Sequence, residues 1–315
     1  MRYVPAIQLA ARVAALALMA VGLATLARAD SFTFTSIAVP DPTYTYVYGI
    51  NGNGEIVGYA DVGGAAVGFL DDGGTYSTFS VPVASGTLAT GVNDKGEIVG
   101  YAVVGGSFVG FLDNGGSYST LSVPSESNTH AYGINYKGEI VGYADADGSY
   151  VGFLDNDGSY STFSVPHASE TYAYGINGSG QIVGYADVGG SYVGFLDDGG
   201  SYSTFSAPHA SETYADGIND SGQMVGYANV GGSYVGFLDD GGSYSTFSVP
   251  HASETYAYGI NDSSQIVGED DQGSFLATPV HPVPEPAPLV MLGAGLVILG
   301  LVFRRRARLG TGRAA

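Results

Sequence analysis

The sequence predicts an all-β fold, a β-propeller of six four-stranded blades, and three observations lead to this prediction. First, a triplet recurs every 42 residues: Ile-Val-Gly begins at Ile56, Ile98, Ile140, Ile182 and Ile266, and Met-Val-Gly at Met224. Second, the segments of each repeat are rich in Tyr, Phe, Val, Ile and Thr, which favour strands. Third, the array begins with one strand-like segment and ends with three, so its two ends can complete a blade.

One repeat divides into four strands, at residues 171–177, 181–187, 191–197 and 201–207. The first three joints are short and contain glycine, which permits the positive φ of tight hairpins. The fourth joint, at residues 208–212, is longer and begins with a proline, which cannot continue a ladder. Each repeat is therefore expected to form an antiparallel meander that leads into the next one.

The ends of the array favour a closed ring over an open solenoid. Residues 31–40 match a fourth strand, and the segments 255–261, 265–270 and 273–279 match the first three. A solenoid would need caps instead, and its flat edges would be exposed. We therefore expect residues 30–280 to form one domain in which the N-terminal strand completes the sixth blade.

Apolar or small residues occupy both faces of the second strand, as expected for strands sandwiched between neighbouring blades. Gly184 and Gly194 lack side chains, so the facing Tyr and Phe rings can pack closely. The tyrosine columns are accordingly predicted to belong to the core between blades rather than to a ligand platform.

Residues 1–29 are predicted to be a cleaved signal peptide. Positive residues precede an apolar run, and Ala27 and Ala29 form an A-x-A cleavage site. An uncleaved membrane anchor is the alternative. The chain contains no cysteine, so an exported form would rely on packing and sheet hydrogen bonds.

The C-terminus carries a second targeting pattern in three ordered parts. A Pro-rich linker at residues 281–286 precedes an apolar stretch at 287–303, predicted to be a transmembrane helix, and a basic cytoplasmic tail at 304–315. The residues that define the pattern are Val283, Pro284, Glu285, Pro286, Arg304, Arg305 and Arg306. This order resembles the PEP-CTERM sorting signal of Gram-negative bacteria. The resemblance implies an exosortase-like processing enzyme as partner and transient anchoring in the inner membrane; a plain single-pass anchor is the alternative.

Between the two termini the chain is strongly acidic. Lys95 and Lys137 are the only basic residues other than histidine between residues 30 and 280, which hold 29 Asp and Glu. Such a surface repels phosphate backbones and anionic membranes. Nucleic-acid binding is therefore excluded, and membrane contact is expected only through the C-terminal helix before processing.

The repeat also resembles the HAF-repeat extracellular proteins, through the pattern YGIN-x-x-G-x-IVGY, an aromatic strand and FSVP. The resemblance covers residues 30–280 and implies an extracellular repeat protein without an assigned activity. The His-Ala-Phe triplet of that family is here Val193-Gly194-Phe195, which removes the histidine.

No nucleophile, HExxH or phosphate-loop motif is present, and no insertion interrupts the repeat to build a lid, so a non-enzymatic protein is expected. Asp216 is the one catalytic candidate, because tyrosine occupies its position in most other repeats. If the first strands line a channel, this carboxylate lies in it. Glycoside hydrolysis needs two carboxylates, and no second one interrupts that column; drift of the repeat is the alternative.

The loops between repeats offer a candidate ligand face. The segment PHASETY occurs three times and supplies His167, Glu170, His209, Glu212, His251 and Glu254. Equivalent residues on adjacent blades are too far apart to share a zinc ion, so each loop would act alone in multivalent binding. A polar loop without a ligand is the alternative.

Acidic turns offer the only candidates for a metal, and no other cofactor is predicted. Asp145, Asp147, Asp155 and Asp157 lie beside glycines in DADG and DNDG, and calcium favours such oxygen-rich turns. Asp-Gly is equally an ordinary hairpin sequence. Structural calcium and a metal-free turn therefore both remain open.

These observations favour an exported, non-enzymatic binding or structural module on the cell surface or in the extracellular matrix. A lectin-like propeller that binds extracellular polysaccharide is one alternative. A glycosidase or lyase that uses the channel near Asp216 is the other.

Overall fold

The computed structural model describes residues 32–40 and 42–280. Every regular element in these residues is a β-strand, and none of them belongs to a helix that could cross a membrane. The predicted signal peptide with Ala27 and Ala29 lies outside the described residues, as do the motif at 283–286, the helix at 287–303 and the arginines at 304–306. The predictions for both termini therefore stay predictions.

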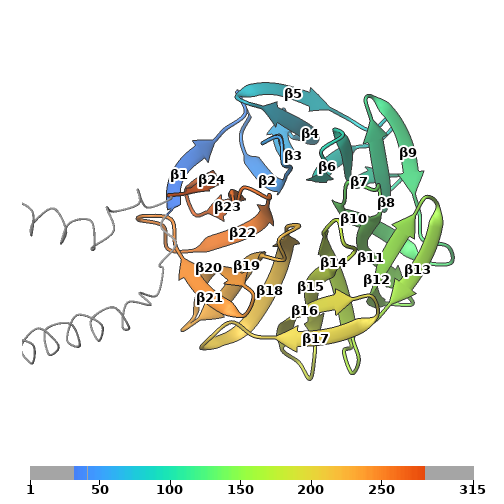
Figure 1. The fold of residues 1–315 in the computed structure, drawn as a ribbon. Helices are drawn as coiled ribbons and strands as arrows, with labels where there is room; N and C mark the ends of the chain where they lie inside the picture. The colour runs from blue at the N-terminus through green and yellow to red at the C-terminus, as the bar shows by residue number, and fades with distance from the viewer. Residues whose placement is uncertain (1–31, 41, 281–315) are drawn as a thin grey trace, which may run out of the picture. The chain divides into compact units, whose positions relative to one another are not determined.

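The described residues form six antiparallel sheets of four strands, which succeed one another around a common centre (Figure 1). Blade 1 consists of β2 (Thr45–Ile50), β3 (Ile56–Val62), β4 (Ala65–Asp72) and β5 (Thr75–Phe79). Blade 2 consists of β6 (Gly86–Val92), β7 (Glu97–Val104), β8 (Ser107–Asn114) and β9 (Ser117–Leu121). Blade 3 consists of β10 (Ser127–Ile134), β11 (Ile140–Ala146), β12 (Ser149–Asn156) and β13 (Ser159–Phe163).

The remaining blades repeat this arrangement, which confirms the predicted six-bladed propeller. Blade 4 consists of β14 (Glu170–Ile176), β15 (Ile182–Asp187), β16 (Tyr192–Asp198) and β17 (Ser201–Phe205). Blade 5 consists of β18 (Ala210–Ile218), β19 (Met224–Val230), β20 (Ser233–Asp240) and β21 (Ser243–Phe247). Blade 6 consists of β22 (Thr255–Ile260), β23 (Ile266–Asp270), β24 (Gly273–Pro279) and β1 (Phe32–Ile37).

The two ends of the propeller meet in blade 6. Strand β1 pairs antiparallel with β24, so that Phe32 lies opposite Pro279 and Ile37 opposite Ser274. The Phe34 ring packs edge-on against Phe275, with 5.5 Å between ring centroids. The N-terminal strand thus completes the sixth blade, as predicted, and covers an edge that would otherwise be open.

Each innermost strand carries a bulge at the same position. In blade 4, Ala173 lies opposite Gly184 and Gly175 opposite Val183, which leaves Tyr174 without a partner in the ladder. The other five blades show the same register shift. A bulge changes the direction of its extra side chain. The six bulge residues are Tyr48, Thr90, Tyr132, Tyr174, Asp216 and Tyr258.

The core lies between blades and consists of phenylalanine and aliphatic side chains. Phe195 of blade 4 is fully buried in a cluster that includes Val141 of blade 3 and Ile182. Glycines make this packing possible: a Cβ on Gly194 would lie 2.6 Å from the Phe205 ring, and one on Gly184 would overlap the Tyr172 carbonyl oxygen. This is the close approach that the sequence predicted for both glycines.

The tyrosine columns pack between blades, as expected, but they do not belong to the deepest part of the core. Tyr185 and Tyr192 pack on neighbouring rings, but they remain partly exposed instead of joining the deepest core. The phenolic hydroxyl explains the difference, because it needs a hydrogen-bond partner or water when the ring is buried. The rings therefore pack between blades with their polar ends near the surface or the channel.

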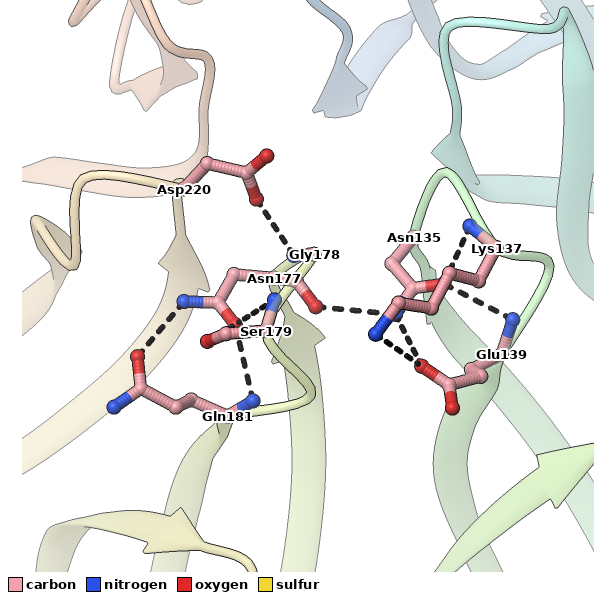
Figure 2. Close-up of polar contacts among 8 residues, drawn as sticks. All are labelled: Asn135, Lys137, Glu139, Asn177, Gly178, Ser179, Gln181 and Asp220. Atoms are coloured by element: carbon pink, nitrogen blue, oxygen red, sulfur yellow. Dashed lines mark hydrogen bonds and ion pairs between the residues drawn. The ribbon is translucent and has the colours of Figure 1, made fainter.

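A closed ring of hydrogen bonds joins the six blades at one mouth of the channel. The Asn135 side-chain amide donates to the Asn177 carbonyl oxygen at 3.1 Å (Figure 2). Asn177 donates to Asn219 in the same way at 3.3 Å. The equivalent bonds join the remaining blades, and Asn261 closes the circle on Asn51 at 3.0 Å. We call Asn51, Asn93, Asn135, Asn177, Asn219 and Asn261 the asparagine ring.

The same asparagines also shape the hairpins after the innermost strands. Asn177 Oδ1 accepts the backbone N–H groups of Ser179 at 3.1 Å and Gln181 at 3.0 Å (Figure 2). Its amide also donates to the Gln181 side chain at 2.9 Å. Each buried amide is therefore satisfied within its own turn and across the blade boundary.

Candidate functional site

The innermost strands β2, β6, β10, β14, β18 and β22 line a central channel. A cavity of ≈ 260 Å³ lies in this channel and is lined by the six bulge residues and by Tyr227. A second cavity of ≈ 140 Å³ lies next to it and ends at the asparagine ring. Both cavities are lined by the same six aliphatic residues: Ile50, Val92, Ile134, Ile176, Ile218 and Ile260.

Glycines keep the innermost strands close together beside the bulge residues. A Cβ on Gly133 would lie 2.6 Å from the Tyr174 carbonyl oxygen, and one on Gly259 equally close to that of Tyr48. No side chain fits in this space without moving a neighbouring blade. The glycines therefore set the distance between blades at the cavity.

Asp216 lies at the bulge of β18, so the sequence-predicted carboxylate does line the channel. Its side chain is 7% exposed, and its Oδ1 atom has no hydrogen-bond partner in the described part of the chain. Burial raises the pKa of this carboxyl well above its usual range. The neutral, protonated form is therefore favoured.

Glu269 is a second buried carboxyl, which the sequence analysis missed. It lies on β23 opposite Tyr256, at a position where the other blades have tyrosine. Its Oε1 atom is buried without a partner among the described residues. Burial raises its pKa to about 8, and a hydrogen bond from the Val47 backbone acts in the opposite direction. A comparison of the second-strand columns, IVGYAD against IVGEDD, would have found it.

The two carboxyls act on a common neighbour. Desolvation raises the pKa of Tyr258, and the charges of Glu269 and Asp216 raise it further. Tyr258 also packs on Tyr48 of blade 1, with 5.2 Å between ring centroids. Asp216, Tyr258 and Glu269 thus form one acidic and aromatic region in blades 5 and 6.

The cavity in this region combines aromatic surface with one carboxyl. The cavity is lined by tyrosine, glycine, aliphatic residues, Thr90 and Asp216, and it contains no His, Cys, Lys or Arg among the described residues. Its polar groups are hydroxyls, backbone groups and one carboxyl. It therefore offers aromatic surface and one acidic group to a small ligand.

A second set of candidate residues lies at three blade boundaries, which we call the tyrosine seams. Each contains one tyrosine from the second strand and one from the third strand of a blade, and one from the first strand of the next blade. The seams are Tyr143, Tyr150 and Tyr172; Tyr185, Tyr192 and Tyr214; and Tyr227, Tyr234 and Tyr256.

The three seams have nearly the same geometry. The ring centroids of the third-strand and first-strand tyrosines are 5.2, 5.4 and 5.3 Å apart in the three seams. The predicted ligand-face glutamates join them: Tyr172 donates to Glu170 at 2.8 Å, and Tyr256 to Glu254 at 2.7 Å. Glu212 contacts Tyr214 likewise and helps to raise its pKa, after desolvation.

The other boundaries depart from this pattern. Between blades 2 and 3, Phe108 and His130 replace two of the tyrosines, and burial lowers the pKa of His130 to about 4. Between blades 6 and 1, Glu269 replaces the second-strand tyrosine. The repeated site is therefore confined to three successive boundaries.

His167, His209 and His251 lie in the loops before the first strands and are exposed. They adopt positive φ values of 68°, 64° and 71°. A buried threonine that follows each histidine holds the loop through a hydrogen bond. Thr171 Oγ1, for example, accepts the Val165 N–H at 3.0 Å. The structure places the three histidines on separate blades, and no three potential metal ligands converge within residues 32–40 and 42–280.

The acidic turns of blade 3 lie at opposite ends of β12. Asp145 and Asp155 each accept a backbone N–H, from Gly148 and Gly158, at 2.8 Å. Asp147 and Asp157 occupy positive-φ turn positions, at 53° and 52°. The four carboxylates therefore do not converge, and ordinary hairpin geometry accounts for the aspartates.

Comparison with known proteins shows the fold class alone. No protein family and no curated protein matches the sequence. Among solved structures, a triple arginine mutant of AofleA from Arthrobotrys oligospora is similar, with 13% identity, a TM-score of 0.51, and coverage of 80% of this chain and 87% of that one. An inactive virginiamycin B lyase from Staphylococcus aureus, with quinupristin, is 11% identical, with a TM-score of 0.49 and coverage of 80% and 100%. YCF48 from Cyanidioschyzon merolae is 12% identical, with a TM-score of 0.45 and coverage of 80% and 99%.

Proposed function

We propose that the protein is an exported, non-enzymatic binding module that holds a neutral extracellular polysaccharide at several equivalent sites. The observation that carries this proposal is the repetition of one geometry at the three tyrosine seams. Packing of the core does not require partly exposed hydroxyls at the same place in successive blades. A polymer with a repeating structure, by contrast, can occupy several equivalent sites.

The chemistry of each seam suits a sugar ring. Partly exposed tyrosine rings such as Tyr192 and Tyr214 offer apolar surface, and their hydroxyls donate and accept hydrogen bonds. The neighbouring glutamate, Glu212 in this seam, adds a strong acceptor for sugar hydroxyls. Such sites are shallow, so each one is expected to bind weakly.

Charge selects a neutral polymer. The domain has two lysines and 29 acidic residues, so an anionic polysaccharide would be repelled along its whole length. A neutral chain that reaches two or three seams gains avidity, because its second contact is intramolecular.

The two buried carboxyls argue against the glycosidase alternative, and only Asp216 of the two lines the channel cavity. Glycoside hydrolysis requires one ionised carboxylate beside one protonated acid. Burial raises the pKa of both Asp216 and Glu269, the latter to about 8, so both favour the neutral form. Neither is then available as a nucleophile or base near neutral pH.

The test is binding of neutral polysaccharides and of their short oligosaccharides, measured by calorimetry. A triple variant with Tyr172→Ala, Tyr214→Ala and Tyr256→Ala lacks one ring of each seam. The matched control is Tyr136→Ala, which removes an exposed tyrosine beside the asparagine ring. We expect the polymer to bind tighter than the oligosaccharide, with about a hundredfold loss in the triple variant. Equal binding by the triple variant and the control would contradict the proposal.

Export and processing are part of the same proposal. The predicted signal peptide and the PEP-CTERM resemblance support delivery to the outside, followed by removal of residues 287–315 by an exosortase-like enzyme. Intact-mass analysis of the native protein tests this, beside a variant with Pro284, Glu285 and Pro286 changed to alanine. A native protein that keeps its arginine tail would leave a simple membrane anchor.

A further inference from the structure

The buried Asp216 carboxyl has an oxygen atom to which no described residue donates a hydrogen bond. Its carboxyl lines the ≈ 260 Å³ cavity, is 7% exposed and has an unpartnered Oδ1 atom. At the equivalent position of blade 2, the polar side chain of Thr90 has a partner: its hydroxyl donates to the Ala131 carbonyl oxygen at 2.9 Å. A buried polar atom without a partner destabilises the fold, so this one indicates a missing ligand.

Tyrosine side chains of three blades line the same cavity as the carboxyl: Tyr174, Tyr227 and Tyr258. Tyr174 and Tyr185 of blade 4, Tyr227 on β19 and Tyr258 on β22 all lie close enough for the Asp216 charge to raise their pKa values. A carboxylate among tyrosine rings is an environment that attracts a cation, since the ring faces carry negative potential.

The described chain cannot supply that cation itself. Its only lysines are Lys95 and Lys137, and neither lines the cavity. Lys137 is instead exposed beside Glu139, with 4.0 Å between the charged atoms. A positive group at Asp216 must therefore come from outside.

We propose that the cavity at Asp216 binds one small organic ammonium ion, with the carboxylate as its counter-charge and the tyrosine rings around it. The volume is slightly below the roughly 300–1,000 Å³ of pockets for drug-sized molecules, which limits the ligand to a small one. An inorganic divalent ion fits less well, because calcium takes about six to eight oxygen ligands and no three potential ligands converge in the described residues.

One mouth of the channel favours entry of a cation. Asp94, Asp220 and Asp262 line the ≈ 140 Å³ cavity beside the asparagine ring, and no Lys, Arg or His lines it among the described residues. Asp94 and Asp220 accept backbone N–H groups of the preceding blade at 2.7 and 2.6 Å, which fixes their carboxylates there. Acidic mouths of this kind concentrate cations from solution.

Binding should release a proton. The free carboxyl of Asp216 favours its protonated form, whereas the bound ammonium stabilises the carboxylate, so the O–H proton passes to solvent as the cation enters. The titratable groups that face Asp216 are Tyr174, Tyr185, Tyr227 and Tyr258, with Glu269 acting across Tyr258. Affinity should then rise with pH, up to about tenfold per pH unit while Asp216 stays protonated in the free protein.

The experiment is calorimetric titration of the intact protein with choline, in two buffers of different ionisation enthalpy. Uncharged dimethylbutanol, which has the same shape, and potassium serve as comparison ligands. Two variants address Asp216: Asp216→Asn removes the charge at constant size, and Asp216→Tyr restores the residue of four other repeats. The exposed Asp198→Asn on an outer hairpin is the charge-matched control.

We expect saturable choline binding with release of about one proton, lost at least tenfold in both Asp216 variants and kept in the control. A thermal melt at or above that of the unchanged protein shows that the variants fold, since each removes an unpaired buried carboxyl. Absence of choline binding, equal binding of dimethylbutanol or potassium, or choline binding without proton release would each overturn the proposal. The site shares Tyr185 and Tyr227 with two tyrosine seams, but neither residue is changed in the Asp216 variants or in the triple tyrosine variant, so either proposal can fail without the other.

Discussion

The asparagine ring lies directly after the six innermost strands, three positions beyond the bulge residues on those strands, yet the two sets of positions follow opposite rules. All six ring positions hold asparagine, and each amide donates to the next blade. The bulge positions hold four tyrosines, Thr90 and Asp216. Closure of the circle therefore demands one residue in every repeat, whereas the cavity beside it tolerates differences between repeats.

Thr90 and Asp216 show two kinds of difference. The Thr90 hydroxyl donates to the backbone of blade 3, so the shorter side chain leaves no unsatisfied group. Asp216 leaves Oδ1 without a donor among the described residues. The first substitution is compatible with packing alone, whereas the second one leaves a buried oxygen without a donor among the described residues.

The largest effect is expected from opening the circle. Removal of residues 32–40 deletes β1, exposes the edge of β24 and removes the Phe34 contact with Phe275. We expect the melting temperature to fall by roughly 10 °C or more and the protein to associate through the free edge. Calorimetry and light scattering provide the measurement, with a chain that starts at Asp30 as the control. A monomer of unchanged stability would show that the asparagine ring closes the propeller without β1.

A smaller loss is expected from one member of the ring. Asn177→Ala removes five side-chain hydrogen bonds, to Asn219, Gln181 and Ser179, so we expect the free energy of unfolding to fall by roughly 2.5–5 kcal/mol, at about 0.5–1 kcal/mol for each bond. Chemical denaturation measures the change, and Tyr174→Phe three positions away is the control, expected to cost about 1 kcal/mol. If both variants lost the same free energy of unfolding, the asparagine ring would be no more important for stability than the bulge positions.

The smallest effect concerns pH. The Glu269 carboxyl has its folded-state pKa raised from 4.5 to about 8, so the folded protein holds a proton that the unfolded chain loses. Stability should therefore fall as pH rises from about 4.5 to 8, by roughly 2 kcal/mol once partial exposure is allowed for. Glu269→Gln should reduce this slope, measured by denaturation at pH 5 and pH 8, whereas Glu212→Gln should not; the buried Asp216 carboxyl, whose pKa is also raised, contributes to the slope that remains. A slope unchanged in Glu269→Gln would assign the effect to another group.

Periodicity alone was sufficient to predict the blades. The 42-residue interval and the glycine turns located the strands to within a few residues, and the offset between the two ends predicted β1 in blade 6. This worked because strand length, hairpin glycines and alternating faces are local properties of the chain. The placement of Asp216 followed in the same way from its column on the innermost strand.

The rest depends on contacts between blades, which a single repeat does not encode. From the sequence, Asn177 is an ordinary turn residue. Only the structure shows that its amide donates a hydrogen bond to the next blade. The residue type of Tyr192 does not tell whether its side chain is buried or partly exposed. The sequence therefore could not distinguish the tyrosine seams from the core. For Glu269 the sequence does contain the signal, because tyrosine occupies its position in the other five repeats.

The asparagine ring has a thermodynamic consequence. All six donors point the same way around the circle, from each blade to the following one and from Asn261 back to Asn51. A linear array of repeats can fray from its ends, unit by unit. A circle without a first or last member offers no such starting point, so losing any blade means breaking two boundaries at once. Nearly identical repeats that could have unfolded independently are thereby coupled into one cooperative transition.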